Sequence, residues 1–260
     1  MMPVLDIADL YLQISHYFWP AVRILAMFMA SPIFTEKQIG KKVKVGLAFL
    51  ICVLIVPGLP ETSIPLFSAA GLWIGIKQLI IGMAIGLSVQ LAFVAVRVAG
   101  EIIGLQMGLS FATFFDPSGG QNMPVIARLL NLLATLLFLT FNGHLWLINV
   151  LNESFVTLPV EGTPFNSNGF LALVQGAGLI FKSGLMLGLP IITLLLCMNI
   201  TLGVLNRLTP QLSIFVIGFP LTLAVGMLSL AMLMYTLSPF FEHLMADVFE
   251  LLSRSLLMLH

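Results

Sequence analysis

Charged side chains near the middle of the chain are the residues whose types and spacing could do chemistry. Arg97 and Glu101 are four residues apart, which on a helix brings a cation and a carboxylate within reach of each other. Asp116 lies further on, in the sequence Phe-Phe-Asp-Pro-Ser-Gly-Gly at 114–120. A proton-coupled transporter needs several buried carboxylates. Apart from Glu101 and Asp116 near the middle of the chain, the apolar segments contain none. Proton coupling by this chain alone is therefore not expected.

The sequence contains no recognisable catalytic or metal-binding set. The four histidines, His16, His144, His243 and His260, are scattered, and none has metal-ligand spacing with a cysteine or a carboxylate. Neither a phosphate-cradling glycine motif nor a nucleophile elbow is present. We therefore expect no enzyme, cofactor or metal site. With 11 Lys and Arg against 11 Asp and Glu, the net charge is zero, which argues against a nucleic-acid partner.

Three cations interrupt apolar segments: Arg23, Lys77 and Lys182. A charge at the centre of a bilayer costs at least ~2.5 kcal/mol on the insertion scale, so such residues usually face a cavity or a partner. Lys182 can instead reach water from a helix end. The same explanation fits Lys77 less well, because its neighbours along the chain are apolar.

The turn-forming segment after residue 110 combines two kinds of residue. Phe111, Phe114 and Phe115 are bulky and apolar, and Asp116, Pro117, Ser118, Gly119 and Gly120 favour a turn. Two interpretations stay open from the residues alone. One is a hinged hydrophobic stopper that packs into an aperture, and the other is a re-entrant turn packed against its own helices. Composition favours the packed turn.

Composition indicates that membrane-type helices position these residues. The chain has 260 residues, of which 59% are hydrophobic and 8% charged, whereas a soluble domain carries about 25% charged residues. The six hydrophobic segments lie at roughly 11–34, 43–59, 66–96, 125–151, 171–205 and 212–237. The third and fifth exceed the ~20 residues that span a bilayer. We expect an all-α, integral-membrane-type protein with about six long helices.

Lysines and arginines alternate with acids along the connections. Four lysines cluster around the connection between the first two hydrophobic segments, at positions 37, 41, 42 and 44, and Arg207 lies between the last two segments. The other connections carry Glu61, Glu153 and Glu161. The positive-inside rule places the lysine loop, the central loop and the turn with Arg207, Pro210 and Gln211 on the cytoplasmic side.

Glycines recur at a spacing of four. They form the pair Gly82 and Gly86 and the series Gly100, Gly104 and Gly108. On a helix each series makes a smooth stripe that another backbone can approach closely. We expect these glycines to pack against neighbouring helices.

Three motifs in order resemble the FliR family of type III secretion export-gate subunits. They are RILAMFMASPIF at 23–34 with IGKKVKVGLAF at 39–49, then Arg97-x-x-Gly100-Glu101 with FATFFDP at 111–117, and LGVLNRLTPQLSIFVIG at 202–218. The resemblance runs along nearly the whole chain.

The resemblance implies a structural and gating subunit of a pore that passes unfolded substrates out of the cytoplasm. It implies FliP-like and FliQ-like partner subunits, an FlhB-like switch subunit, contact with membrane lipid, and a place in the bacterial inner membrane. It also implies a pore plug at 111–123, which favours the stopper interpretation. The chain would divide into a FliP-like part at 1–170, a FliQ-like hairpin at 171–237 and an amphipathic tail at 238–260.

Two alternatives remain from the sequence. Flagellar and virulence members share these motifs, so a virulence export gate stays open. A multipass small-solute transporter or channel is the other alternative, and the lack of paired buried acids argues against it.

Overall fold

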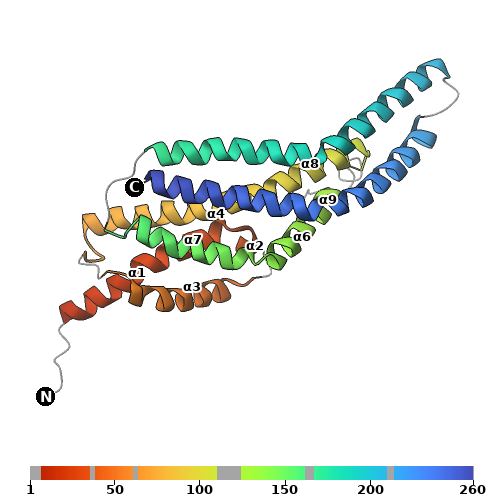
Figure 1. Cartoon of the computed structure of the whole chain (residues 1–260). Helices are drawn as coiled ribbons and strands as arrows, with labels where there is room; N and C mark the ends of the chain where they lie inside the picture. Colours follow the sequence, from red (N-terminus) through yellow and green to blue (C-terminus); the bar gives the residue numbers. More distant parts are fainter. Residues whose placement is uncertain are drawn as a thin grey trace. The chain divides into compact units, whose positions relative to one another are not determined.

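The computed structural model of the chain describes residues 7–35, 39–60, 64–109, 124–161, 167–209 and 214–259. These residues form helices, and no strand occurs among them (Figure 1). The helices are α1 (Ile7–Ala30), α2 (Pro32–Thr35), α3 (Lys41–Ile55), the 3₁₀ turn η1 (Val56–Gly58), α4 (Ala69–Gln106), α6 (Val125–Thr140), α7 (Gly143–Thr157), α8 (Ser167–Leu208) and α9 (Ile214–Leu259). The all-α fold predicted from the sequence is confirmed.

Local backbone chemistry sets where several helices end. Pro57 lies in the 3₁₀ turn that terminates α3, because proline cannot donate to the preceding turn. Asn142 is the N-cap residue of α7 and adopts a left-handed conformation with φ 55°, which asparagine tolerates better than most residues. The apolar segment at 125–151 therefore forms two helices rather than one.

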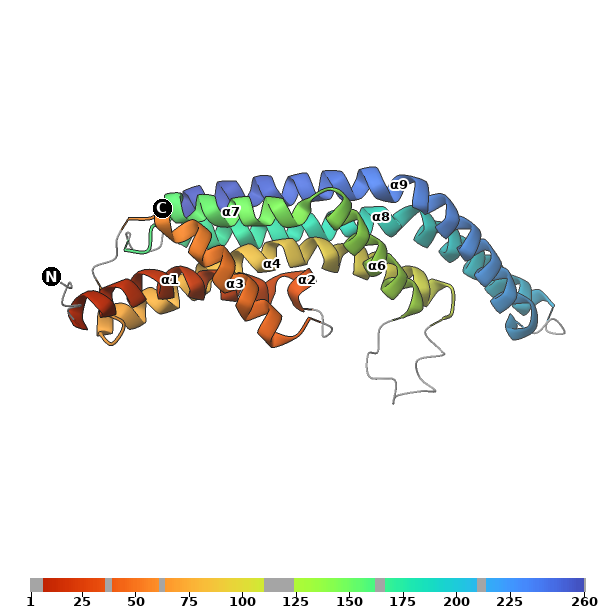
Figure 2. The same cartoon turned by 90° about the horizontal axis from the view of Figure 1, so that it is seen from below.

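The chain separates into two compact units. The first contains residues 1–90, 142–177 and 248–260, so it holds α1, α2, α3, α7, the first part of α4 and the ends of α8 and α9. In this unit α3 packs on α1 (Figure 2), and the Cys52 thiol donates to the Tyr17 carbonyl at 3.2 Å. Trp146 of α7 stacks on Phe249 of α9, with ring centroids 5.5 Å apart.

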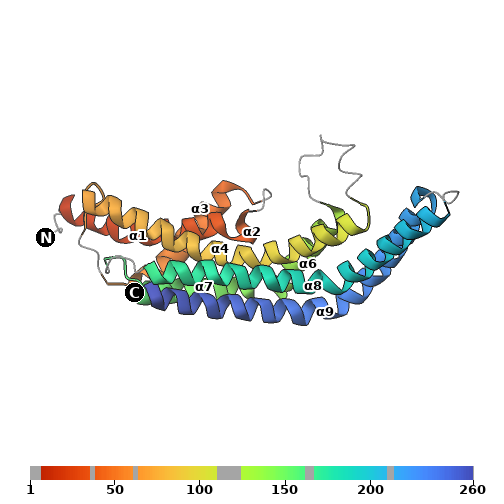
Figure 3. The ribbon, with the colours of Figure 1, turned by 90° about the horizontal axis from the view of Figure 1, so that it is seen from above.

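The second unit contains residues 91–141 and 178–247. It holds the last part of α4, all of α6 and long parts of α8 and α9, which run side by side (Figure 3). Its core includes the rings of Phe93, Phe138 and Phe241, and Phe93 meets both others edge to face. Neither unit begins or ends at residue 170, where the sequence predicts a division. The FliP-like and FliQ-like parts stay a prediction.

Fewer than six of the helices that the structure describes are long and apolar enough to cross a membrane. Among the described residues they are Ala69–Gln106, Leu171–Leu208 and Ile217–Leu259, with the bent pair α6 and α7 as a fourth if it counts as one span. The second predicted segment falls short because α3 has only 15 residues. The first predicted segment corresponds to α1, which has 24 residues and is long enough to span. It is not among the candidate spans because it includes the polar Gln13, His16 and Arg23. The predicted tail at 238–260 is continuous with α9 as far as Leu259, and Pro239 lies inside that helix.

Candidate functional site

Gly108 ends α4 with a defined hydrogen-bond pattern. Its φ of +78° lies in the left-handed region, where glycine has no Cβ to clash. The Gly108 N–H donates to the Leu105 carbonyl at 3.0 Å, and the Leu109 N–H donates to the Gly104 carbonyl at 3.1 Å. These two bonds form a Schellman motif, which satisfies carbonyls that a helix end leaves unpaired. The chain therefore leaves the axis of α4 at Gly108, immediately before the 110–123 segment.

α6 begins beside the last turns of α4. Pro124 is its N-cap residue, with φ −53° and ψ 146°. A Cβ added at Gly104 would lie 3.5 Å from the Pro124 Cβ and 3.8 Å from the Ile126 Cβ, which is ordinary van der Waals contact. The two helix ends that flank the 110–123 segment therefore touch each other. We call this place the α4 exit, made of residues 104–109 and 124–126.

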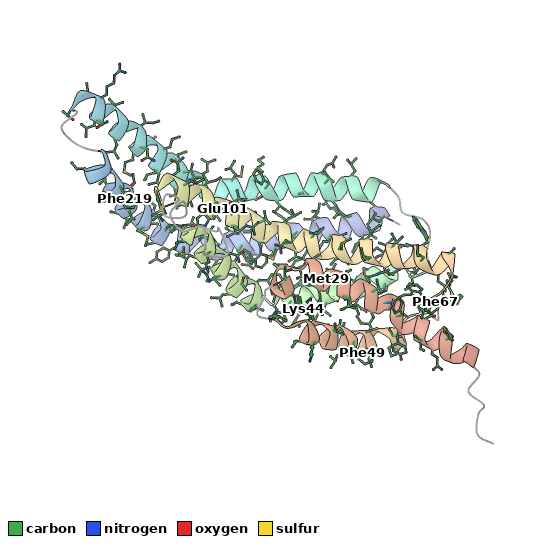
Figure 4. The ribbon with its side chains drawn as sticks, turned by 180° about the vertical axis from the view of Figure 1, so that it is seen from behind. Met29, Lys44, Phe49, Phe67, Glu101 and Phe219 are labelled. Atoms are coloured by element: carbon green, nitrogen blue, oxygen red, sulfur yellow. The ribbon has the colours of Figure 1, made fainter. Side chains whose placement is uncertain are left out.

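Helices α8 and α9 hold three successive residues of the α4 exit. Asn199 of α8 donates from Nδ2 to the Gln106 carbonyl oxygen at 3.1 Å and to its Oε1 at 3.2 Å. Met107 is fully buried and lies against Gly226 of α9, where an added Cβ would come within 2.6 Å of the Met107 Cγ. At Gly108 an added Cβ would lie 3.3 Å from Cδ2 of Phe219, a residue labelled in Figure 4. One residue of α8 and two of α9 thus fix where α4 stops.

The predicted plug lies outside the described residues. This applies to Phe111, Phe114, Phe115, Asp116, Pro117, Ser118, Gly119 and Gly120. Of the predicted hairpin turn, Arg207 is exposed in the last turn of α8, whereas Pro210 and Gln211 are also outside the described residues. The roles of both segments stay predictions.

Arg97 and Glu101 form an ion pair on α4. Nε of Arg97 lies 3.7 Å from Oε1 of Glu101, and the two side chains are 33% and 40% exposed. Pairs of this kind contribute a few tenths of a kcal/mol. Glu101 is labelled in Figure 4, on the part of α4 that belongs to the second unit.

The glycines at a spacing of four have different surroundings. A Cβ at Gly86 would lie 2.6 Å from the Met27 carbonyl oxygen, and one at Gly82 would meet the Arg23 carbonyl oxygen and lie 2.8 Å from the Ala26 Cβ. The first unit therefore packs α4 closely on α1. In the second unit a Cβ at Gly100 would lie 2.7 Å from the Ala127 Cα of α6. Gly104 has room for a small side chain, and Gly108 is the helix stop, so the series is not one uniform stripe.

Arg23 is a fully buried cation of the first unit. Its Nε donates to Oε1 of Gln78 at 2.7 Å, and its Nη1 and Nη2 donate to the carbonyl oxygens of Ser154 and Leu158, each at 2.7 Å. The guanidinium also lies 4.2 Å from the centroid of the Phe155 ring. Ser154 and Leu158 are in the last turn and at the C-cap of α7, where the helix dipole favours a positive charge. From the sequence, Arg23 was expected to face a cavity or a partner, and in the structure its main partner is the end of α7.

No cluster of three or more His, Cys, Asp or Glu that could hold a metal ion occurs in the described part of the chain. The described residues around the α4 exit form packed helices that flank an anchored connection. This arrangement can position a segment and hold helices together.

Residues 14–248 match the family described as bacterial export proteins, family 1. The chain belongs to this family.

This export protein is 58% identical to the flagellar biosynthetic protein FliR of Pectobacterium carotovorum subsp. carotovorum over 245 residues, 94% of each chain. It is also 58% identical to FliR of Escherichia coli (strain K12) over 237 residues, 91% of each chain. FliR of Bacillus subtilis (strain 168) is 27% identical over 216 residues, 82% of this chain and 83% of that protein. The FliR resemblance inferred from motifs is confirmed, and the chain is a membrane-associated component of the flagellar type III export apparatus.

Sequence reasoning did not identify the residues of this export protein that hold the α4 exit. Asn199 carried the clearest signal, because a polar amide inside a long apolar helix usually hydrogen-bonds to another helix. Phe219 and Gly226 carried none, since apolar and small residues are common in this chain. Only the contacts across the second unit distinguish them.

Proposed function

We propose that this chain is a structural and gating subunit of the flagellar export pore and passes unfolded substrates out of the cytoplasm. The observation that supports gating most directly is the α4 exit. The 110–123 segment connects two helix ends that touch, Gly104 against Pro124, and three of the residues before it are held by α8 and α9. A segment anchored at both ends on a packed base can change conformation without unfolding the helices that carry it.

The plug function is assigned to residues 111–123. Phe111, Phe114 and Phe115 fill the aperture of the closed pore, because large apolar rings exclude water and ions from a narrow opening. Residues 116–120 provide the hinge, because glycine permits backbone conformations that other residues resist. Sealing is necessary because a pore wide enough for an unfolded chain would dissipate the ion gradient across the membrane.

FliP-like, FliQ-like and FlhB-like subunits are the proposed partners, and the bacterial inner membrane is the proposed location. Exposed apolar side chains support contacts of this kind. On α8 they include Phe181, Met186 and Ile200, and on α9 Met232 and Tyr235. Exposed apolar surface on this scale marks contact with lipid or with other subunits. The proposed role is structural, with the energy for export supplied by other components.

Deleting residues 114–120 tests the plug. The export complex should still assemble, but cells that overproduce it should admit small ions and solutes, measured as conductance or as entry of a membrane-impermeant dye. Asp116→Asn is the matched control, because it keeps the phenylalanines and the loop length, and it should stay tight. If the deletion variant assembles and stays tight, the segment is a packed turn and not a plug.

Stiffening the hinge tests gating separately from sealing. Gly119→Pro combined with Gly120→Val should block flagellar export while the seal holds, because the loop can no longer change conformation. The measurement is secretion of flagellar proteins into the medium together with dye entry. Normal secretion by this variant would exclude residues 119 and 120 as the hinge.

Co-purification tests the partners. An affinity-tagged chain should retain FliP-like and FliQ-like subunits through detergent extraction. A chain that purifies alone or only with copies of itself would contradict the assembly proposed here.

A further inference from the structure

Helix α3 has an unusually apolar exposed face. Val43, Phe49 and Leu54 are 62%, 63% and 72% exposed, and Leu47, Leu50 and Val53 are also exposed. Only Ala48, Ile51 and Cys52 are buried, on the side that packs against α1. A helix of this kind in water would normally carry polar residues on its outer face. Something apolar must therefore cover the outer face of α3.

Lysines concentrate at one end of the same helix. Lys41 and Lys42 are exposed and Lys44 is half-buried, and α3 contains no acid. Within the described residues no ion pair involves these three side chains. They lie at the helix N-terminus, where the helix dipole disfavours positive charge. Helix stability therefore does not explain the cluster. Figure 4 labels Lys44 and Phe49 on this helix.

Length decides how α3 can meet a membrane. Its 15 residues make a rod of about 22 Å at 1.5 Å per residue, and the hydrocarbon core is about 30 Å thick. The helix is too short to span but long enough to lie in one leaflet. Its aliphatic face would then contact acyl chains, and the lysine stems would carry their ammonium groups to the headgroups.

Charge distinguishes a lipid from a protein as the occupant. Protein–protein interfaces are depleted in lysine and enriched in arginine and aromatic residues. Apart from Phe49, the exposed face of α3 instead combines lysines with aliphatic residues. Anionic headgroups of the cytoplasmic leaflet attract lysines near the membrane surface. We propose that α3 is an anionic-lipid docking helix, in which Lys41, Lys42 and Lys44 bind phospholipid phosphates and the face from Val43 to Leu54 lies among acyl chains.

This proposal goes beyond gating and does not depend on the plug. Its first test measures binding of phosphatidylglycerol and of phosphatidylcholine to the purified full chain by native mass spectrometry. Replacing Lys41, Lys42 and Lys44 together by Gln should lower the apparent affinity for phosphatidylglycerol, by about fivefold for each lysine in contact with the surface. Phosphatidylcholine binding should not change. Lys182→Gln, which removes an exposed lysine from α8, is the control and should bind both lipids normally.

A second test addresses the apolar face in the export complex isolated from cells. A fluorophore on Phe49→Cys, in a chain with Cys52→Ser and Cys197→Ser, should be quenched by chain-brominated phosphatidylglycerol in nanodiscs. Replacing Lys41, Lys42 and Lys44 together by Gln should reduce that quenching. A label on native Cys197, in a separate chain with Cys52→Ser alone, should be insensitive to the same replacement. Unchanged phosphatidylglycerol affinity in the triple variant would overturn the lipid assignment. A Phe49 label that the complex shields from brominated lipid would also overturn it, by showing that another subunit covers α3.

Discussion

Asn199 of α8 and Gln106 of α4 are joined by two hydrogen bonds, from Nδ2 to the Gln106 carbonyl oxygen and to its Oε1, at 3.1 and 3.2 Å. The residues are 93 positions apart in the chain. Their bonds connect α8 to the last residue of α4, two residues before the glycine that stops it. The pair therefore sets the register of α8 against the α4 exit.

Asn199→Leu should destabilise the chain by about 1–2 kcal/mol, because it removes both bonds and leaves the Gln106 side chain without its partner. Helix–helix hydrogen bonds in membrane proteins average less than that, so about 2 kcal/mol is an upper bound. The measurement is the thermal unfolding midpoint of the detergent-solubilised chain. Asn149→Ala is the control, because Asn149 bonds only to Glu153 at an exposed position of its own helix. An equal fall of the unfolding midpoint in both variants would mean that the two bonds to Gln106 stabilise the chain no more than an exposed hydrogen bond within one helix.

Gly108→Ala should destabilise the chain by about 1–2 kcal/mol. An L-residue with φ near +78° is strained, and the added Cβ would also press on the Phe219 ring. Gly108→Asn should cost less backbone strain, because asparagine tolerates the left-handed region. Chemical denaturation of the two variants separates these contributions. If alanine is tolerated as well as glycine, the Schellman stop does not limit stability.

Gly100→Ala and Gly104→Ala should have different outcomes although the residues are four positions apart. At Gly100 the new Cβ would lie 2.7 Å from the Ala127 backbone, so α4 and α6 would have to separate, at a cost of about 1–3 kcal/mol. At Gly104 the nearest atom would be 3.5 Å away, and alanine is the better helix former. We expect that variant to be neutral or slightly stabilised. Unfolding midpoints of the two variants, compared in one detergent, provide the measurement.

Arg23→Met should be the most destabilising single change considered, by about 3 kcal/mol or more. It keeps an unbranched side chain but leaves the buried acceptors on Gln78, Ser154 and Leu158 without the guanidinium. Arg23→Lys should recover only part of the loss, because an ammonium cannot reproduce the planar fork that reaches three separate acceptors. Full recovery with lysine would show that charge at the end of α7 matters and that hydrogen-bond geometry does not.

Thr209→Cys tests the orientation predicted from charge. Thr209 follows directly after α8 and is exposed, and the positive-inside rule places the neighbouring Arg207 in the cytoplasm. In a chain without other exposed cysteines, a membrane-impermeant thiol reagent should label this position in inverted vesicles and not in intact cells. Labelling from the periplasmic side would reverse the predicted orientation.

The sequence by itself determined the class of the protein. The scarcity of charge and the long apolar segments require helices, because only helices or closed barrels satisfy their backbone groups in lipid. Three ordered motifs identified the family, and the spacing of Arg97 and Glu101 was enough to predict their ion pair, since that contact is local. Residues 110–123 stood out because their composition differs from that of the surrounding helices.

The tertiary structure decided which residues hold these helices in place. Hydrophobicity could not reveal that residues 125–151 break at Asn142, nor that α3 is too short to span. Spacing treated Gly100, Gly104 and Gly108 alike, whereas their neighbours come from α6 and α9. Arg23 in an apolar segment required hydrogen-bond acceptors. Only the tertiary structure shows that these lie at the end of α7, more than 130 residues away. Periodicity encodes which face of a helix is buried, but the residue that meets that face depends on chain-distant packing, which no local pattern contains.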